Sequence, residues 1–185
     1  MKGFPIHAGQ APKYTGALPD AVDLVVIGGG VIGICTALFA ARSGAKVLVL
    51  EKGLVAGEQS SRNWGWIRQQ GRDPDEMPIM AEAQRLWVQL SRETNEDIGL
   101  VQAGVTYLAG SEKTLAGYEK WLPHAAPLGV TSKMLSRAEL AALYPGLTET
   151  PLGALHTSSD YRAEPWAAVP ALAGIAVREG VQITE

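Results

Sequence analysis

Three glycines directly after an apolar run constrain the fold of this chain more than any other feature. Residues 22–27 read VDLVVI, the apolar and β-branched pattern of a parallel strand that is buried on both faces. The glycines that follow have the spacing G-x-G-x-x-G: Gly28, Gly30 and Gly33. Residues 31–44 carry apolar side chains at helical spacings, and residues 45–51 form a second apolar run. This order predicts a strand–helix–strand unit in an α/β protein.

Each glycine has a physical task in such a unit. Gly28 permits the tight turn after the strand, Gly30 lets a pyrophosphate approach the backbone, and Gly33 lets the helix pack closely on the sheet. The first amides of the helix, including those of Val31 and Ile32, lack intrahelical partners and favour a phosphate. We therefore predict a Rossmann-type dinucleotide-binding unit. A glycine-rich structural turn in an α/β protein is the alternative.

An acidic residue ends the second apolar run. Glu51 lies 23 residues after Gly28, close to the roughly 20 residues expected for a ribose-binding carboxylate. Its carboxylate can accept hydrogen bonds from ribose hydroxyls and would repel a 2′-phosphate, which argues against NADP. Lys52, the next residue, is included among the predicted cofactor contacts. Because NAD and FAD both contain an adenosine ribose and a pyrophosphate, this unit alone does not distinguish them.

A segment of small and polar residues follows, with the sequence QSSRNWG. Its hydroxyl, guanidinium and amide groups can face phosphate, and its glycine allows close backbone approach. The predicted cofactor contacts here are Gln59, Ser60, Ser61, Arg62, Asn63 and Gly65. A polar surface loop is the alternative. Trp64 and Trp66 fit a solvated loop poorly, because large rings usually bury area.

The stretch from Asp23 to Gly71 resembles the FAD-dependent D-amino acid oxidase (DAO) superfamily, which includes glycine oxidase, sarcosine oxidase and amino-acid deaminases. Residues 50–65, LEKGLVAGEQSSRNWG, look especially like deaminase and amine-dehydrogenase members, and residues 160–183 are also similar. In that superfamily the glycine turn holds the FAD pyrophosphate, and the acidic residue binds the adenosine ribose. The segment that matches Gln59 to Gly65 runs along the cofactor toward the isoalloxazine. The resemblance therefore implies FAD as the cofactor.

The resemblance also implies an enzyme that oxidises the C–N bond of an amino acid or a secondary amine by hydride transfer to flavin. Its partners would be a small-molecule substrate and an unidentified electron acceptor. No general base is required if the amine binds neutral, so the catalytic residue stays unknown. Arg68 and Arg72 are candidates to face a substrate carboxylate, or they are solvated. A non-catalytic dinucleotide-binding fragment or subunit, and an NAD-dependent dehydrogenase, are the alternatives.

The expected organisation follows the resemblance along the chain. Residues 1–20 form a flexible arm, and residues 21–75 contain the FAD-binding βαβ unit and the flavin-proximal loop. Residues 76–160 contain a helix and part of an inserted α+β substrate-binding lobe. Residues 161–185 return to the FAD-binding domain. Members of the superfamily are longer than 185 residues, so we expect an N-terminal fragment that is truncated at its C-terminus. Within the lobe, the S-x-x-E sequence of residues 136–139 predicts a capping box.

Composition limits the partners and the compartment. The formal net charge of -3 gives no electrostatic footprint for nucleic acid. Three histidines, His7, His124 and His156, lie far apart without a metal-ligand spacing, so no metal is predicted. The single cysteine, Cys35, excludes an internal disulfide and is consistent with a reducing compartment. Because no apolar run has the length of a signal peptide or a membrane span, we expect a cytoplasmic location.

Overall fold

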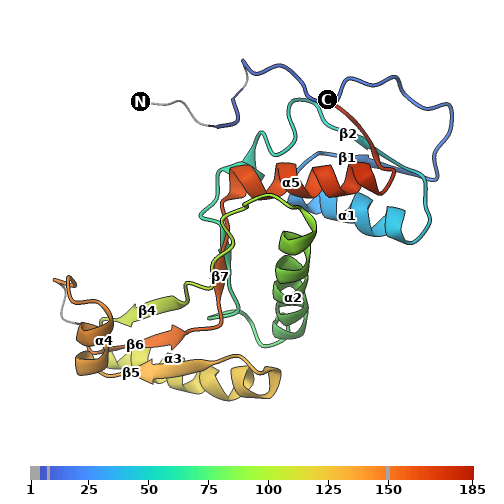
Figure 1. Cartoon of the computed structure of the whole chain (residues 1–185). Coiled ribbons are helices and arrows are strands. Elements are labelled where there is room, and N and C mark those ends of the chain that lie inside the picture. The colour runs from blue at the N-terminus through green and yellow to red at the C-terminus, as the bar shows by residue number, and fades with distance from the viewer. Residues whose placement is uncertain (1–4, 8, 149–150) are drawn as a thin grey trace. The chain divides into compact units, whose positions relative to one another are not determined.

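The computed structural model describes residues 5–7, 9–148 and 151–185. It divides the chain into two compact units, whose boundaries differ from the predicted ones. The first unit contains Met1–Gly65, Gln89–Leu100 and Ala163–Glu185, and the second contains Trp66–Val88 and Val101–Arg162 (Figure 1). Each unit is therefore built from segments that are far apart in the sequence.

The first unit is built around a parallel sheet with the strand order β1-β2-β8. Its elements are β1 (Leu24–Ile27), α1 (Val31–Arg42), β2 (Val47–Leu50), η1 (Gln59–Ser61), α5 (Pro165–Arg178) and β8 (Gln182–Thr184). β1 pairs with β2 in parallel, with Val26 opposite Val49 and Ile27 opposite Leu50. The predicted order of strand, helix and strand over residues 22–51 is present, and α1 provides the crossover that two parallel strands need.

The core of the first unit is aliphatic and includes the contact between its two helices. α1 and α5 pack against each other along the sheet (Figure 1). α1 buries Ile34, Ala37 and Leu38 completely, each with 0% exposed surface. α5 begins at Pro165, whose missing amide is not needed in the first turn of a helix. Because α1 is closely packed, the glycine turn at its start has a rigid support.

The second unit contains an antiparallel sheet with the order β4-β6-β5 and a two-stranded ribbon of β3 and β7. The elements of this unit, in chain order, are β3 (Trp66–Ile67), β4 (Val105–Ala109), α3 (Glu112–Ala125), η2 (Ala126–Leu128), β5 (Ser132–Leu135), α4 (Arg137–Leu143), β6 (Gly153–Thr157) and β7 (Tyr161–Arg162). The predicted capping box is confirmed at the start of α4. The Glu139 amide donates to Ser136 Oγ at 3.3 Å, and the Glu139 carboxylate accepts from the Ser136 amide at 2.8 Å.

The helix α2 (Met77–Glu93) starts in the second unit and ends in the first. The residues after it join the first unit because they pair with the segment that leads into α5. The Glu164 amide donates to the Ile98 carbonyl at 2.9 Å. Residues 89–100 therefore belong to the first unit, although the sequence favours a single lobe over residues 76–160.

Apolar side chains recur at helical spacing as a stripe along one face of α2, and this face points toward the protein interior. Leu90 is 3% exposed, and Met80, Ala83 and Trp87 are half-buried. Met77, one turn before the stripe, is fully buried. These side chains therefore serve core packing, as their spacing predicts. Within the described part of the chain, no helix combines the length and the apolar character that a membrane crossing needs.

Candidate functional site

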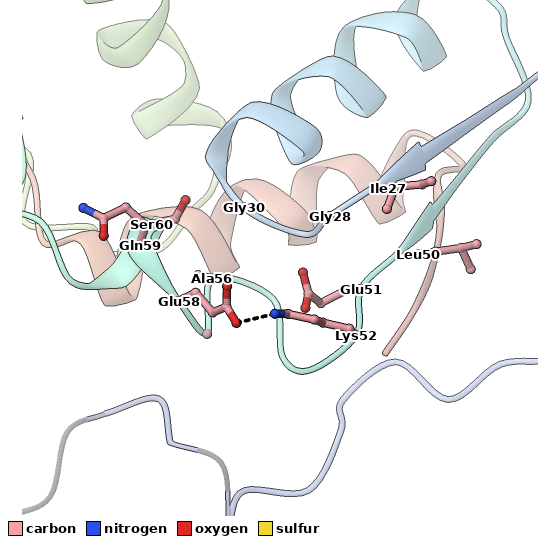
Figure 2. Close-up of a pocket in the computed structure, with 11 residues that line it drawn as sticks. Ile27, Gly28, Gly30, Leu50, Glu51, Lys52, Ala56, Glu58, Gln59 and Ser60 are labelled. Carbon is pink, nitrogen blue, oxygen red and sulfur yellow. Dashed lines mark ion pairs between the residues drawn. The ribbon is translucent and has the colours of Figure 1, made fainter.

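A cavity of about 360 Å³ lies at the carboxyl ends of β1 and β2. Its lining comes from the glycine turn and from the segment that follows β2. The lining residues are Ile27, Gly28, Gly30, Leu50, Glu51, Lys52, Ala56, Gly57, Glu58, Gln59 and Ser60 (Figure 2). Parallel α/β sheets bind their ligands at this edge. Six predicted cofactor contacts thus lie together around one cavity.

The glycine turn is too crowded for side chains at two of its positions. A Cβ atom on Gly33 would lie 1.9 Å from the carbonyl oxygen of Gly28, so α1 can start this close to β1 only with glycine there. A Cβ atom on Gly30 would lie 2.9 Å from Ser60 Oγ. Gly28 itself has a φ of +108°, which side-chain-bearing residues rarely adopt. The turn therefore needs glycine for its own packing as well as for any ligand.

The hydroxyl of Ser60 lies at the start of α1. Its Oγ accepts a hydrogen bond from the Val31 amide at 2.9 Å, so the hydroxyl hydrogen stays available as a donor. Among the described residues, no partner accepts from the amides of Ile32 and Gly33. Free amides in the first turn of a helix favour an anion. The hydroxyl and the amides together can therefore hold a phosphate group.

The carboxylate of Glu51 fixes the backbone on both sides of the cavity. Its Oε2 accepts from the Gly29 amide at 2.7 Å, and its Oε1 accepts from the Gly53 amide at 2.8 Å. Figure 2 shows this carboxylate pointing toward the glycine turn. Because each carboxylate oxygen can accept more than one hydrogen bond, both oxygens keep acceptor capacity for ribose hydroxyls. The predicted ribose ligand thus also holds the turn, a role that the sequence does not reveal.

Lys52 and Glu58 form an ion pair at the edge of the cavity. Lys52 Nζ and Glu58 Oε1 are 2.8 Å apart (Figure 2), and both side chains are largely exposed. The hydrogen bond from Lys52 lowers the pKa of Glu58. With Glu51, the lining carries two carboxylates and one ammonium group. This net negative charge suits a ligand that presents hydroxyl groups to Glu51, because a 2′-phosphate there would be repelled.

Two further predicted contacts hold the loop after β2 together. Ser61 is 1% exposed, and its hydroxyl donates to the Glu58 carbonyl at 3.2 Å. Arg62 Nη2 donates to the Gly57 carbonyl at 2.9 Å. Neither Ser61 nor Arg62 lines the cavity. Their side chains shape the loop that presents Ser60.

The remaining two predicted contacts, Asn63 and Gly65, close the same loop. Asn63 Nδ2 donates to the carbonyls of Gln59 and Ser60, each at 3.2 Å, and its Oδ1 accepts from the Gly65 amide at 2.8 Å. Gly65 has a φ of +68°, and a Cβ atom there would lie 2.0 Å from the Ala163 carbonyl oxygen. The close approach to the backbone of Gly65 is therefore made by another segment of the chain, at Ala163.

Five lining residues are not among the contacts predicted from the sequence: Ile27, Leu50, Ala56, Gly57 and Glu58. Ile27 and Leu50 are the last residues of their strands, so the strand ends could have identified them. Ala56 has a φ of 61°, a left-handed conformation that is uncommon for alanine. The local sequence does not predict that conformation, because contacts with residues far away in the sequence impose it.

The candidate arginines for a substrate carboxylate both have protein partners within the second unit. The guanidinium carbon of Arg68 lies 6.0 Å from the ring centroid of Trp66 and 5.7 Å from that of Tyr107. Arg72 and Glu76, both in the segment that precedes α2, form an ion pair at 3.7 Å. These contacts give both guanidinium groups a structural role, and neither residue lines the cavity beside the glycine turn.

A buried carboxylate in the second unit also serves the fold. Asp160 is 0% exposed and accepts from the amides of Gln69 at 2.8 Å and Gln70 at 3.1 Å. Burial raises the pKa of Asp160, and the two amides oppose that shift. Across the described residues, no cluster of three or more His, Cys, Asp or Glu side chains is placed to hold a metal ion.

Comparison with known protein families matches residues 23–185 to the family described as "FAD dependent oxidoreductase" (DAO). Mitochondrial sarcosine dehydrogenase from Homo sapiens is 29% identical over 174 residues, which are 91% of this chain and 19% of that protein. The mitochondrial pyruvate dehydrogenase phosphatase regulatory subunit from Mus musculus is 26% identical over 175 residues, which are 94% of this chain and 20% of that protein.

A solved structure with the same mixed α/β fold is that of L-amino acid deaminase from Proteus myxofaciens in complex with anthranilate. It superposes with a TM-score of 0.87 at 30% sequence identity. The match covers 93% of this chain and 40% of the deaminase chain. The chain thus spans about a fifth of the length of the two curated relatives and less than half of this structure.

Proposed function

Because the chain belongs to the FAD-dependent oxidoreductase (DAO) family, we propose that its glycine-turn cavity holds the adenosine and pyrophosphate part of FAD. The family is FAD-dependent, which confirms the cofactor that the sequence resemblance implies. The observation that carries the proposal is a group of hydrogen-bond donors beside Gly30 that have no acceptor among the described residues. They are the Ser60 hydroxyl and the amides of Ile32 and Gly33.

The residues present fit this cofactor chemically. A pyrophosphate needs hydrogen-bond donors and close backbone access, and the Rossmann-type turn supplies both at the start of α1. An adenosine ribose needs an acceptor, which the free positions on the Glu51 carboxylate supply. Ile27 is 88% exposed and offers an apolar surface at the strand end. Ser60 and Glu51 are therefore the two side chains assigned to direct cofactor contact.

For the reaction, we infer oxidation of the C–N bond of a small amine or amino acid. FAD, when bound, accepts a hydride from the carbon that carries the nitrogen. The inference is supported by the similarity to a sarcosine dehydrogenase and to an L-amino acid deaminase. The described residues contribute cofactor binding and orientation. No described residue is assigned a proton transfer, and the substrate contacts stay unassigned.

A non-catalytic role in an assembly is the second candidate. It is favoured by the similarity to the regulatory subunit of pyruvate dehydrogenase phosphatase over 94% of this chain. Both candidates are compatible with a bound dinucleotide, so FAD binding does not separate them. Oxidation of an amine or amino acid with a dye as electron acceptor would establish the first candidate, because a regulatory subunit would bind FAD without oxidising an amine.

The test of the cofactor proposal is a competition experiment on the purified chain. FAD binding is followed by the change in flavin fluorescence, first alone and then with ADP or riboflavin as competitor. If the cavity holds the adenosine diphosphate half, ADP displaces FAD and riboflavin does not. Displacement by riboflavin alone would place the flavin half in the main binding site and would contradict the assignment of Ser60 and Glu51.

A further inference from the structure

We propose that Glu185 is a positioning residue for the cofactor cavity and that it couples the N-terminal segment to the loop lining that cavity. This inference rests on the proposed FAD site. Glu185 lies directly after β8 and does not line the cavity. Its side chain acts on the site through the backbone of other segments.

One carboxylate joins three segments of the first unit. Glu185 Oε2 accepts from the Lys13 amide at 2.6 Å and from the Tyr14 amide at 3.0 Å. Glu185 Oε1 accepts from the Val55 amide at 2.6 Å. Hydrogen bonds to a carboxylate are shorter and stronger than those between neutral groups. The side chain therefore ties the N-terminal segment and the loop after β2 to the end of the sheet.

The backbone around Glu185 supports the same junction. Thr15 forms an antiparallel bridge with Thr184, and the Glu185 amide donates to the Tyr14 carbonyl at 2.9 Å. On the other side, the Glu51 amide donates to the Thr184 carbonyl at 2.9 Å. Part of the predicted flexible arm is thus paired with β8, one strand away from the residue assigned to the ribose (Figure 1).

Val55, which is bonded to Glu185, directly precedes a residue that lines the cavity. Val55 is 5% exposed, and the next residue, Ala56, lines the cavity with a φ of 61°. The Ala56 amide donates to the Gly29 carbonyl at 3.0 Å. An alanine in the left-handed region persists only when its neighbours hold it there. Glu185 holds Val55, the residue before Ala56, and the glycine turn holds Ala56 itself.

Linkage makes this coupling reciprocal. If attachment of the N-terminal segment orders the cavity for FAD, bound FAD must strengthen that attachment by the same factor. Cleavage by trypsin at the Lys13–Tyr14 bond reports the attachment, because a protease needs this segment to detach from β8. FAD affinity and protection of this bond are therefore two independent measurements of one coupling.

The experiment uses the full chain as wild type, Glu185→Gln and Glu185→Ala. The matched control is Asp23→Asn, since Asp23 Oδ2 also accepts a backbone amide, that of Lys46 at 2.8 Å, but these two residues precede β1 and β2, at the opposite ends of the strands from the cavity. FAD dissociation constants come from fluorescence titration. Cleavage after Lys13 is followed by mass spectrometry with and without FAD. Thermal unfolding without FAD reports general stability.

We expect Glu185→Ala to weaken FAD binding about tenfold, within the usual range of coupling between sites. In the wild type, FAD slows cleavage after Lys13 by a similar factor, and in Glu185→Ala this protection disappears. Glu185→Gln keeps one oxygen acceptor and shows an intermediate effect, so it serves if the alanine variant does not fold. Asp23→Asn keeps the wild-type FAD affinity within about twofold and keeps the protection.

Three outcomes would overturn this inference, and only one of them would also overturn the proposed function. Wild-type FAD affinity in both Glu185 variants, with binding still weakened in Glu51→Ala, would overturn the coupling and leave the FAD site intact. A wild-type chain that binds no FAD would overturn both. Equal weakening of FAD binding in Glu185→Ala and Asp23→Asn would show a general loss of stability and would also overturn the positioning role.

Discussion

Ser60 Oγ lies 2.9 Å from the amide nitrogen of Val31, so a residue of the loop after β2 caps the helix that begins after β1. The two residues are 29 positions apart in the sequence. The contact explains why Gly30 lacks a side chain, since a Cβ atom there would lie 2.9 Å from the same oxygen. It also leaves the hydroxyl hydrogen of Ser60 to face a phosphate group.

Replacing Ser60 by alanine should therefore weaken FAD binding. Ser60→Ala removes the acceptor for Val31 and the donor toward the pyrophosphate. We expect a loss of about 1–2 kcal/mol, or about five- to thirtyfold in the dissociation constant. A fluorescence titration with FAD measures it.

The control for that variant is Ser61→Ala. Ser61 is buried and donates to the Glu58 carbonyl, so its loss should lower the free energy of unfolding and leave the FAD dissociation constant within about twofold. If Ser61→Ala weakens FAD binding as much as Ser60→Ala does, both changes act through the conformation of the loop. That result would contradict a direct contact between Ser60 and the cofactor.

The sequence reveals those parts of the fold that depend on neighbouring residues. The strand, glycine turn and helix from Leu24 to Arg42 follow from periodicity and from the conformations open to glycine. The capping box of Ser136 and Glu139 needs only a spacing of three residues. In both cases the stabilising contact and the signal lie within the same short stretch.

The contacts that complete the cavity lie far apart in the sequence and leave no local signal. Val55 and Glu185 are 130 residues apart, and the hydrogen bond between them exists only once β8 has joined the sheet. The left-handed conformation of Ala56 depends on its bond to Gly29. Ser61 shows the opposite problem, because its hydroxyl suits a phosphate by type but is turned inward by the loop.

Glu51→Ala should weaken FAD binding more than Ser60→Ala does. The change removes acceptors for the ribose and also releases the amides of Gly29 and Gly53 that shape the cavity. The expected loss is about 1.5–3 kcal/mol, or about 10- to 150-fold in the dissociation constant. Titration of the apo-protein with FAD measures this loss.

Glu58→Gln is the matched control for Glu51. Glu58 also lines the cavity, but its side chain pairs with exposed Lys52, and exposed pairs contribute little. Its FAD affinity should stay within about twofold of the wild type. Equal losses in the two variants would show a general charge effect and would count against a specific ribose contact.

Cys35 should make stability depend on pH in the alkaline range. Burial raises the pKa of its thiol to about 11, from 9.0 in the absence of that burial. The unfolded chain therefore loses this proton first, so the contribution is fully present below about pH 9 and is lost as the pH rises toward 11. The difference between the two pKa values corresponds to a loss of about 3 kcal/mol.

Urea unfolding of wild type and Cys35→Ala at several pH values measures this dependence. The variant should lack the part of the decline that the thiol causes. Alkylation by iodoacetamide at pH 8 gives a second check, because the thiolate is the reactive form. Rapid labelling of the folded wild type would contradict the raised pKa of Cys35.

Gly33→Ala should damage the fold, whereas the same change at Gly174 should not. A methyl group on Gly33 would lie 1.9 Å from the Gly28 carbonyl oxygen, so α1 would have to move away from β1. We expect the free energy of unfolding to fall by about 3 kcal/mol or more, because backbone atoms cannot move aside cheaply. In Gly174→Ala, the new methyl group would lie at ordinary contact distance, 3.8 Å, from Arg178 Nη1. There the smaller chain entropy of the unfolded state should stabilise the protein by about 0.5–1 kcal/mol. Urea denaturation of both variants tests the pair, and equal stability of the two would show that the close approach of α1 to β1 does not require Gly33.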